Sequence, residues 1–267
     1  MQAQSRLPDL CREFYINDGG IKLHLKLDMP AGLNKCPLAI VLHGITGHME
    51  ERHIAAVSRG LNDSGVASLR AELYGHGQSG GDFSEHDVLK WLNNVMAVTD
   101  YAKSLDFVTE LYICGHSQGG LTAILAAGKR PDDYGAVIAL SPALCITDGA
   151  RRGKLLRTSF DPGNIPDTLE LAGRRISGDY VRAARRLDQD TAIRSFKGPV
   201  LIVHGSADRT VPLEYSRAAA GKFSDAELKI IEGDTHCYDN HLNEVVAAVK
   251  AFITSVCIPP SRSRSSG

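Results

Sequence analysis

The sequence predicts an α/β fold in which a mostly parallel sheet is covered by helices on both faces. Short β-branched, apolar runs alternate with longer amphipathic segments, and the later runs are apolar at nearly every position. Repeated strand–helix–strand units make strands parallel, and a strand buried on both faces is continuously apolar. A chain of 267 residues, 43% of them hydrophobic, is also long enough to bury such a core.

The first two predicted strands form an antiparallel pair. EFYIND (13–18) and IKLHLKLDM (21–29) are joined by Asp18-Gly19-Gly20, a turn that suits a hairpin. Six more strands are predicted from the apolar runs LAIVLHG (38–44), VASLRAEL (66–73), LYICG (111–115), AVIALS (136–141), VLIVHG (200–205) and LKIIEG (228–233). The amphipathic segments predict helices at 50–64, 85–104, 118–129, 213–223 and 240–255.

One connection is too long for this alternation. Residues 142–199 separate two predicted strands, and TSFDPGNIPDTLE within them is rich in turn-forming residues. We therefore expect one domain over 1–257 with an inserted cap at about 145–190. The basic, low-complexity end, 258–267, is expected to be a disordered tail or an expression scar.

Composition and charge exclude several classes of function. Lys+Arg and Asp+Glu number 30 and 31, so there is no basic field for nucleic acid or an anionic membrane. No apolar stretch reaches the roughly 20 residues of a membrane helix, and the N-terminal segment lacks the apolar core of a secretory signal. The six cysteines show no metal-ligand spacing. We expect a cytoplasmic protein with reduced thiols and a small-molecule partner; a homodimer is compatible with the sequence, which does not specify it.

The segment GHSQGG (115–120) joins an apolar strand to an apolar helix through a serine. In a strand–Gly-x-Ser-x-Gly–helix joint the serine occupies a strained turn, and a Cβ at either flanking glycine would collide with the strand or helix. The hydroxyl then stands at the carboxyl edge of the sheet, where open α/β folds bind ligands. We predict that Ser117 is a nucleophile; the alternative is an ordinary helix N-cap serine.

A serine nucleophile needs a base, and the base needs an acid that orients it, in the chain order serine, acid, histidine. Asp208 follows the strand VLIVHG and His236 follows LKIIEG, so both belong to the same sheet edge as Ser117. We predict that His236 is the base and Asp208 the acid, with Asp234 as the competing acid. The alternatives are a surface-loop histidine and an aspartate that caps the turn before Val211.

The negative charge that develops on a substrate oxygen requires backbone N–H donors. Gln118, directly after the serine, and Ile45, in the loop LHGITGH, are the predicted donors. His43 is expected to brace that loop, and His76 in YGHGQSG is expected to be structural. The histidines form no zinc pattern and no glycine-rich phosphate loop opens a helix, so we expect no metal and no cofactor.

The motifs HGITG, YGHGQSGG, GHSQGG, HGSADRTVP and EGDTHCY, in this order and spacing, resemble those of α/β-hydrolases across residues 12–256. Within that fold, HGxTG, FDPGNIPDTLE and GDYVRAARRLD are similar to the bacterial cinnamoyl (feruloyl) esterases, intracellular enzymes that release hydroxycinnamic acids from their esters. The resemblance implies a serine carboxylesterase with a capped active site and a small ester substrate.

The resemblance also implies two substrate-binding residues in the cap. In that family an early acid and a later tyrosine are thought to hold the phenolic hydroxyl of the substrate, and by position these are Asp148 and Tyr180. Alternatively, Asp148 caps the turn at Gly149 and Tyr180 only packs. Glu72, where related hydrolases more often carry aspartate, is expected to be a buried structural acid.

Two other functions stay open at this point. A monoacylglycerol lipase or lysophospholipase shares every core motif, although it would need a more apolar cap than the charged stretches ARRGK and RAARR indicate. A non-catalytic ligand-binding protein of the same fold would keep the pocket and lose the triad, whereas all three triad residues are present here.

Overall fold

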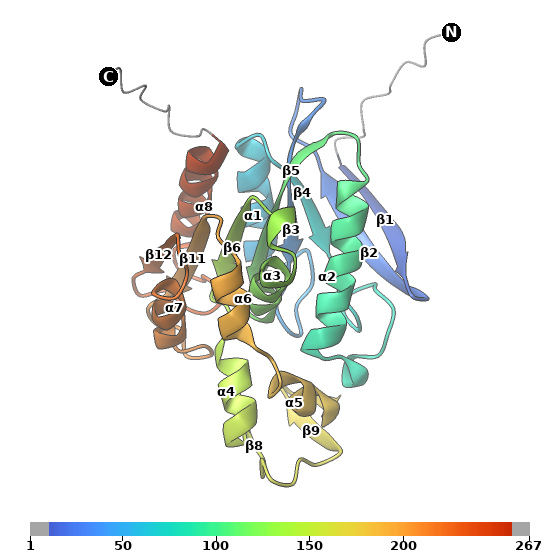
Figure 1. Ribbon diagram of the computed structural model, residues 1–267, viewed down its shortest axis with the longest axis vertical. Coiled ribbons are helices and arrows are strands. Elements are labelled where there is room, and N and C mark those ends of the chain that lie inside the picture. Colours follow the sequence, from blue (N-terminus) through green and yellow to red (C-terminus); the bar gives the residue numbers. More distant parts are fainter. Residues whose placement is uncertain (1–10, 258–267) are drawn as a thin grey trace.

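An eight-stranded sheet runs through the computed structural model, which describes residues 11–257 (Figure 1). Its strands are β1 (Cys11–Asp18), β2 (Ile21–Asp28), β3 (Cys36–Leu42), β4 (Ala67–Ala71), β5 (Val108–His116), β6 (Ala136–Leu140), β11 (Val200–Gly205) and β12 (Ala226–Ile231). Their spatial order is β1-β2-β4-β3-β5-β6-β11-β12. Pairing is antiparallel from β1 through β2 to β4 and parallel across the rest. The predicted fold class is confirmed; the predicted tail, 258–267, lies outside the described residues.

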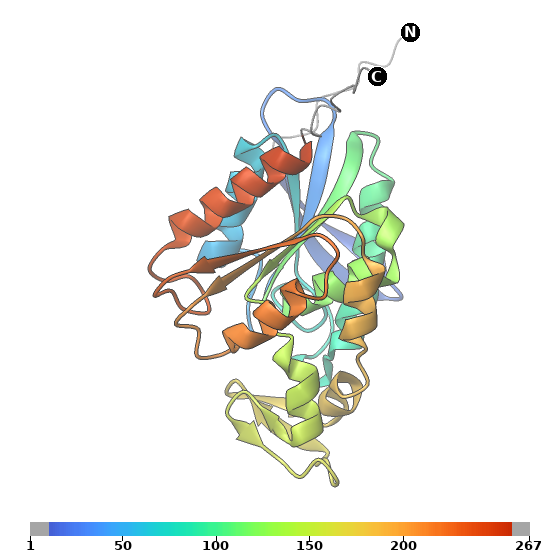
Figure 2. The ribbon, with the colours of Figure 1, turned by 60° about the vertical axis from the view of Figure 1, so that its left-hand side comes forward.

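Helices cover both faces of this sheet (Figure 2). On one face lie α1 (Arg52–Asp63) and α8 (Leu242–Cys257); on the other lie α2 (Val88–Lys103), α3 (Gln118–Lys129), α6 (Gln189–Ser195) and α7 (Leu213–Ala220). Two short 3-10 helices span Phe83–Glu85 and Pro131–Asp133. Successive residues of β3 serve opposite faces, since Ile40 packs toward α2 and α3 while Val41 packs toward α1 and α8, and both are fully buried. Burial on both faces explains the continuous apolar runs.

The long connection between β6 and β11 projects from one end of the molecule (Figures 1 and 2). It contains α4 (Cys145–Arg152), the antiparallel pairs β7 (Lys154–Leu155) with β8 (Thr158–Ser159) and β9 (Thr168–Leu171) with β10 (Arg174–Ser177), and then α5 (Asp179–Ala184). We call residues 145–184 the insert. After it, α6 returns to the sheet and packs against α3, where a Cβ on Gly128 would collide with Ala192. The insert therefore lies within the range predicted for the cap.

Candidate active site

Ser117 stands at the junction of β5 and α3 in a strained backbone conformation. Its φ of 55° and ψ of −120° lie in a region that residues other than glycine rarely occupy, at a cost of about 1–3 kcal/mol. A Cβ on Gly115 would collide with the carbonyl group of Gly119, and one on Gly119 with the carbonyl oxygen of His43. Both flanking glycines are thus required by close backbone approach, for the reason predicted from the sequence.

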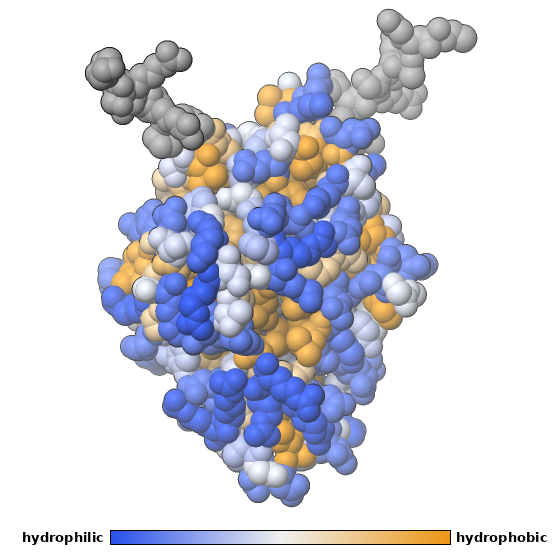
Figure 3. Space-filling model, viewed as in Figure 1, coloured by the Kyte–Doolittle hydropathy of each residue, from blue (hydrophilic) through white to orange (hydrophobic). Residues whose placement is uncertain are grey.

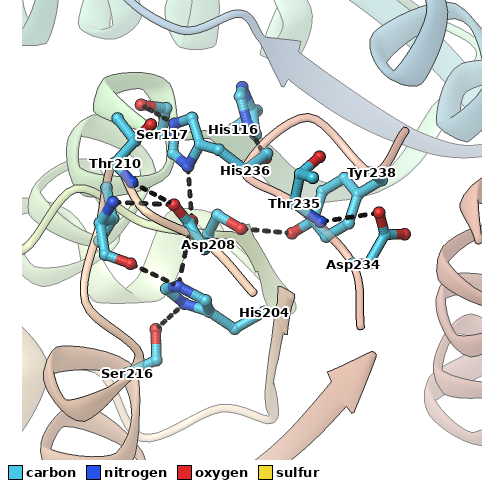
Figure 4. Close-up of polar contacts among 12 residues, drawn as sticks. His116, Ser117, His204, Asp208, Thr210, Ser216, Asp234, Thr235, His236 and Tyr238 are labelled. Carbon is cyan, nitrogen blue, oxygen red and sulfur yellow. Dashed lines mark hydrogen bonds and ion pairs between the residues drawn. The ribbon is translucent and has the colours of Figure 1, made fainter. Parts of the chain in front are cut away.

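Ser117, His236 and Asp208 form a continuous chain of hydrogen bonds (Figure 4). Ser117 Oγ lies 2.9 Å from His236 Nε2, and His236 Nδ1 lies 2.7 Å from Asp208 Oδ2. Because an ionised carboxylate only accepts hydrogen bonds, Nδ1 carries the hydrogen and Nε2 is free to accept the serine proton. The structure thereby brings together three residues that were predicted from three separate strand ends.

The Asp208 carboxylate is held by the loop that follows β11. Its side chain is fully buried, and Oδ1 accepts the N–H groups of Thr210 at 2.7 Å and Val211 at 2.9 Å. Burial raises the pKa of this carboxyl, but hydrogen bonds from His204 and His236 outweigh burial and hold its pKa well below the usual range. Asp208 is therefore ionised at neutral pH, as an orienting acid must be.

Asp234, the competing acid, has a different role in the structure. It is fully buried, and its carboxylate accepts three backbone N–H groups, from Thr235 at 2.8 Å, Asn240 at 3.1 Å and His241 at 2.9 Å. These bonds stabilise the turn that leads into α8. The acid that contacts His236 is Asp208.

The two predicted oxyanion donors come from different loops at the sheet edge. Gln118 is the first residue of α3, where the backbone N–H has no intrahelical acceptor. Ile45 follows β3 and lines the same cavity as Ser117. The next N–H along this loop, that of Thr46, donates to His76 Nε2 at 3.1 Å and is thus engaged, which favours Ile45 as the second donor.

His43 and His76 brace this loop through defined tautomers. His43 Nδ1 donates to the Gly44 carbonyl at 2.7 Å, and its Nε2 accepts the N–H of Leu73 at 3.3 Å. His76 Nδ1 donates to the carbonyl of Tyr74 at 2.9 Å while its Nε2 accepts from the oxyanion loop. Each ring thus has a structural use, consistent with the expectation from the sequence.

Buried neutral histidines predict a loss of stability in mild acid. Burial lowers the pKa of His43 and His76 to about 3 and that of His53 and His86 to about 4. Histidines of an unfolded chain titrate near 6.5, so below this pH the unfolded state binds more protons and the free energy of unfolding falls. Each such histidine contributes a slope of about 1.4 kcal/mol per pH unit between about pH 6.5 and its folded pKa. Urea unfolding should show a clearly lower midpoint at pH 5 than at pH 7, and equal midpoints would contradict this assignment.

A cavity of about 630 Å³ opens beside Ser117 and extends between the sheet edge and the insert. This volume is in the range of small-molecule sites. Asp148 of α4 and Tyr180 of α5 both line it, together with Leu155 and Leu156. The two residues assigned by resemblance to substrate binding therefore share one cavity with the triad.

Asp148 and Tyr180 have different hydrogen-bond partners. Asp148 Oδ2 accepts the Tyr215 hydroxyl at 2.6 Å and lies 2.9 Å from the Arg152 guanidinium. Tyr180 is only 1% exposed, and its hydroxyl donates to Gln118 Oε1 at 2.8 Å. The phenolic oxygen of Tyr180 keeps the capacity to accept a hydrogen bond from a ligand.

Sequence reasoning missed Tyr215 and Arg152, although each had a signal. Arg152 lies four residues after Asp148, one turn along the same helix. Tyr215 lies on α7, which begins soon after the Asp208 loop and hence at the same sheet edge. Both residues line the cavity.

Other residues outside this cavity are explained by the fold. Glu72 is 4% exposed, lies 3.0 Å from His24 Nδ1 and accepts the N–H of Gln78, as a structural acid does. Within residues 11–257 no group of three or more histidine, cysteine, aspartate or glutamate side chains is arranged so that it could hold a metal ion. The helices of that same range are all too short or too polar to span a bilayer.

The chain is similar to known hydrolases in both sequence and structure. A family model described as serine aminopeptidase, S33, matches residues 35–163. Est1E from Butyrivibrio proteoclasticus, solved with ferulic acid bound, is 51% identical, with a TM-score of 0.90 and a match that covers 91% of this chain and 99% of Est1E. The chain belongs to the α/β-hydrolase family. This α/β-hydrolase is a carboxylic ester hydrolase, and the resemblance found in its sequence is confirmed.

More distant relatives of this α/β-hydrolase include lipases. Human monoglyceride lipase is 26% identical over 268 residues, which cover 88% of this chain and 86% of the lipase. Human Protein ABHD12B is 27% identical over 185 residues; the match covers 68% of this chain but only 48%, about half, of that protein.

Proposed function

We propose that this hydrolase is a serine carboxylesterase that cleaves hydroxycinnamate (feruloyl or cinnamoyl) esters through Ser117, His236 and Asp208. The observation that carries the proposal is the chain of hydrogen bonds from Ser117 Oγ to Asp208. Ser117 lines a cavity that Asp148 also lines. The similarity to Est1E, which was solved with ferulic acid, supports a hydroxycinnamoyl group as the acyl half.

In the proposed reaction each of these groups has a defined role. Ser117 Oγ attacks the ester carbonyl while His236 Nε2 takes its proton, and the Asp208 carboxylate stabilises the resulting imidazolium. The backbone N–H groups of Gln118 and Ile45 donate to the oxyanion, each contributing about 3–4 kcal/mol to the transition state. His236 then protonates the leaving alcohol, and water attacks the acyl-enzyme with His236 again as base.

The insert acts in this proposal as a cap over the acyl half. Asp148 from α4, Leu155 from β7 and Tyr180 from α5 line the cavity from the insert side. Asp148 accepts a hydrogen bond from the phenolic O–H of the substrate, and the hydroxyl oxygen of Tyr180 is a second acceptor for the same O–H. The side chain of Leu155 contacts the aromatic ring of the substrate.

Replacing Asp148 with alanine should lower kcat/KM for methyl ferulate about 10- to 150-fold, because a hydrogen bond to a charged group contributes about 1.5–3 kcal/mol. Tyr180→Phe should lower it about 2- to 10-fold, the range for a neutral hydrogen bond. A short nitrophenyl ester, which does not reach the insert, should change less than about threefold in either variant.

Arg152→Ala is the matched control, since it removes a partner of Asp148 without removing the acceptor. It should affect methyl ferulate much less than Asp148→Ala does. If both substrates lose activity together in Asp148→Ala, the residue is structural and the phenol is bound elsewhere.

The match to human monoglyceride lipase keeps one alternative, a monoacylglycerol lipase or lysophospholipase. The insert argues against it, because the face of the insert in Figure 3 is mainly hydrophilic. The other alternative, a non-catalytic binder, is opposed by the intact Ser117–His236–Asp208 geometry. A panel of methyl ferulate, chlorogenate, a monoacylglycerol and short nitrophenyl esters separates these functions: the esterase prefers the first two, the lipase the third, and a binder turns over none.

We further propose a cytoplasmic location. A homodimer stays a prediction that sedimentation equilibrium of the purified chain would test.

A further inference from the structure

His204 is a fully buried polar residue beside the triad that the mechanism above does not use. It is the next-to-last residue of β11, in the otherwise apolar run VLIVHG, and its ring lies between Asp208 and α7 (Figure 4). Because burying a polar side chain costs free energy unless its nitrogens have partners, both ring nitrogens should be satisfied. They are, and one of the partners belongs to the triad.

The partners of His204 define where its hydrogen lies. Nε2 faces two acceptors, the Val211 carbonyl at 3.0 Å and Asp208 Oδ2 at 3.2 Å. Neither oxygen can donate, so Nε2 must carry a hydrogen. Nδ1 lies 2.7 Å from the hydroxyl of the fully buried Ser216 on α7, which donates to it in the Nε2–H tautomer.

We propose that His204 is a positioning residue of the triad, one that fixes the Asp208 carboxylate and reduces the negative charge that it presents to His236. Its N–H contacts Oδ2, the oxygen that also accepts from His236 Nδ1 at 2.7 Å. The same N–H holds the carbonyl of Val211, whose own N–H donates to Oδ1 at 2.9 Å. His204 thus acts on both carboxylate oxygens, directly on one and through the loop on the other.

Two effects on catalysis follow, and both rest on the proposed function of this site. A fixed carboxylate keeps the His236 ring oriented with Nε2 toward Ser117. Loss of this orientation should therefore lower kcat and leave KM nearly unchanged. A second N–H on Oδ2 also disperses part of the carboxylate charge, so the His236 imidazolium is stabilised less. Without His204, Asp208 presents its full charge to the imidazolium, and the acidic limb of the kcat/KM profile should move to higher pH.

The other titratable or charged groups near His236 and Asp208, from the surrounding elements, are Glu51, His53, His116, Cys145, Arg209, Cys237 and Tyr238. Burial lowers the pKa of His53 to about 4 and holds the pKa of His116 well below its usual range, and burial raises the pKa of both cysteine thiols to about 11. None of these four side chains changes charge near neutral pH. All seven groups are unchanged when His204 alone is substituted, so a shift of the pH profile reports on His204.

Two substitutions separate the two contacts of the ring. In His204→Gln the amide nitrogen can occupy the position of Nε2 and keep an N–H on Asp208; in His204→Asn the shorter amide can replace only Nδ1 and keeps the Ser216 side. We expect His204→Asn to lower kcat about 10- to 100-fold with KM nearly unchanged, and to move the acidic limb of kcat/KM upward by about 0.5–1 pH unit. The kcat of His204→Gln should stay within about threefold of the wild-type value, and the acidic limb of its kcat/KM profile should not move.

The control is His24→Gln, which alters an equally buried histidine 3.0 Å from the Glu72 carboxylate, outside the triad. It should change stability without moving the pH limb. Rates are normalised to the number of sites labelled by a fluorophosphonate, so partial misfolding of a variant does not count as slow catalysis. If labelling and ester turnover fail in the wild type, the proposed esterase function is wrong; if an active His204→Asn enzyme keeps the wild-type kcat and pH limb, only the role of His204 is wrong.

A second measurement needs no variant. The ¹⁵N resonances of His204 in the wild-type protein should show a hydrogen on Nε2. A ring that is protonated only on Nδ1 would place a lone pair against Asp208 and would overturn the proposal.

Discussion

Ser117→Ala abolishes ester hydrolysis, with an expected fall in kcat of about 10⁶-fold, because the parts of a triad act as a unit and the nucleophile has no substitute. The fold should persist, since alanine replaces only the hydroxyl and inherits the backbone conformation at φ 55°. Binding of ferulate, measured by calorimetry, should stay close to that of the wild type. Turnover of methyl ferulate by the purified variant is the measurement, and more than a few per cent of wild-type activity would remove Ser117 from the mechanism.

Ser141→Ala is a matched control for this result. Ser141 is also a buried serine at positive φ, 42°, directly after the neighbouring strand β6. Its hydroxyl lies 2.9 Å from that of Tyr238, and not against the imidazole of His236. The control should keep activity within about tenfold of the wild type, so a large loss confined to Ser117→Ala reports on chemistry and not on the strained backbone.

Asp208→Asn should lower kcat by about 10⁴-fold with little change in fold. An asparagine amide can donate to His236 Nδ1, which forces the ring hydrogen onto Nε2 and removes the lone pair that accepts the serine proton. Steady-state kinetics on methyl ferulate and on a short nitrophenyl ester should show the same factor for both, because the acid acts on the common chemical step.

Asp234→Asn is the comparison that decides between the two acids. Since the Asp234 carboxylate accepts N–H groups from Thr235, Asn240 and His241, its replacement should lower the free energy of unfolding while kcat per folded molecule changes little. The opposite ranking, with Asp234→Asn the slower enzyme, would show that the acid has been assigned to the wrong residue.

The sheet and the position of the candidate site were predictable from local sequence. Strands such as LAIVLHG and VLIVHG are apolar up to the histidine near their ends because both faces are covered. Parallel strands end at one edge of the sheet, so Ser117, Asp208 and His236 were expected to lie near one another. The close approach of Gly119 to the His43 carbonyl is a property of the same joint. These inferences need only the spacing of apolar residues, the order of the elements along the chain and the position of each strand end.

The insert was predictable only as an interruption. Strands β7 and β8 have two residues each, too few for any periodic pattern, and their pairing depends on the turn between them. Two partners are also beyond local sequence, because Tyr215, which contacts Asp148, and Gln118, which contacts Tyr180, come from elements far away along the chain. His204 carried a signal, a histidine in an apolar strand four residues before Asp208, whose meaning depends on the loop that returns Asp208 to its ring.

The most direct test of the proposed function is the mass of the enzyme during turnover of methyl ferulate. Rapid acid quenching followed by intact and peptide mass spectrometry should show one feruloyl group attached to Ser117, absent in Ser117→Ala, and formed far more efficiently than an acyl adduct from a monoacylglycerol. A wild-type enzyme that hydrolyses the monoacylglycerol and shows neither turnover of methyl ferulate nor a feruloyl adduct on Ser117 would contradict a hydroxycinnamate esterase.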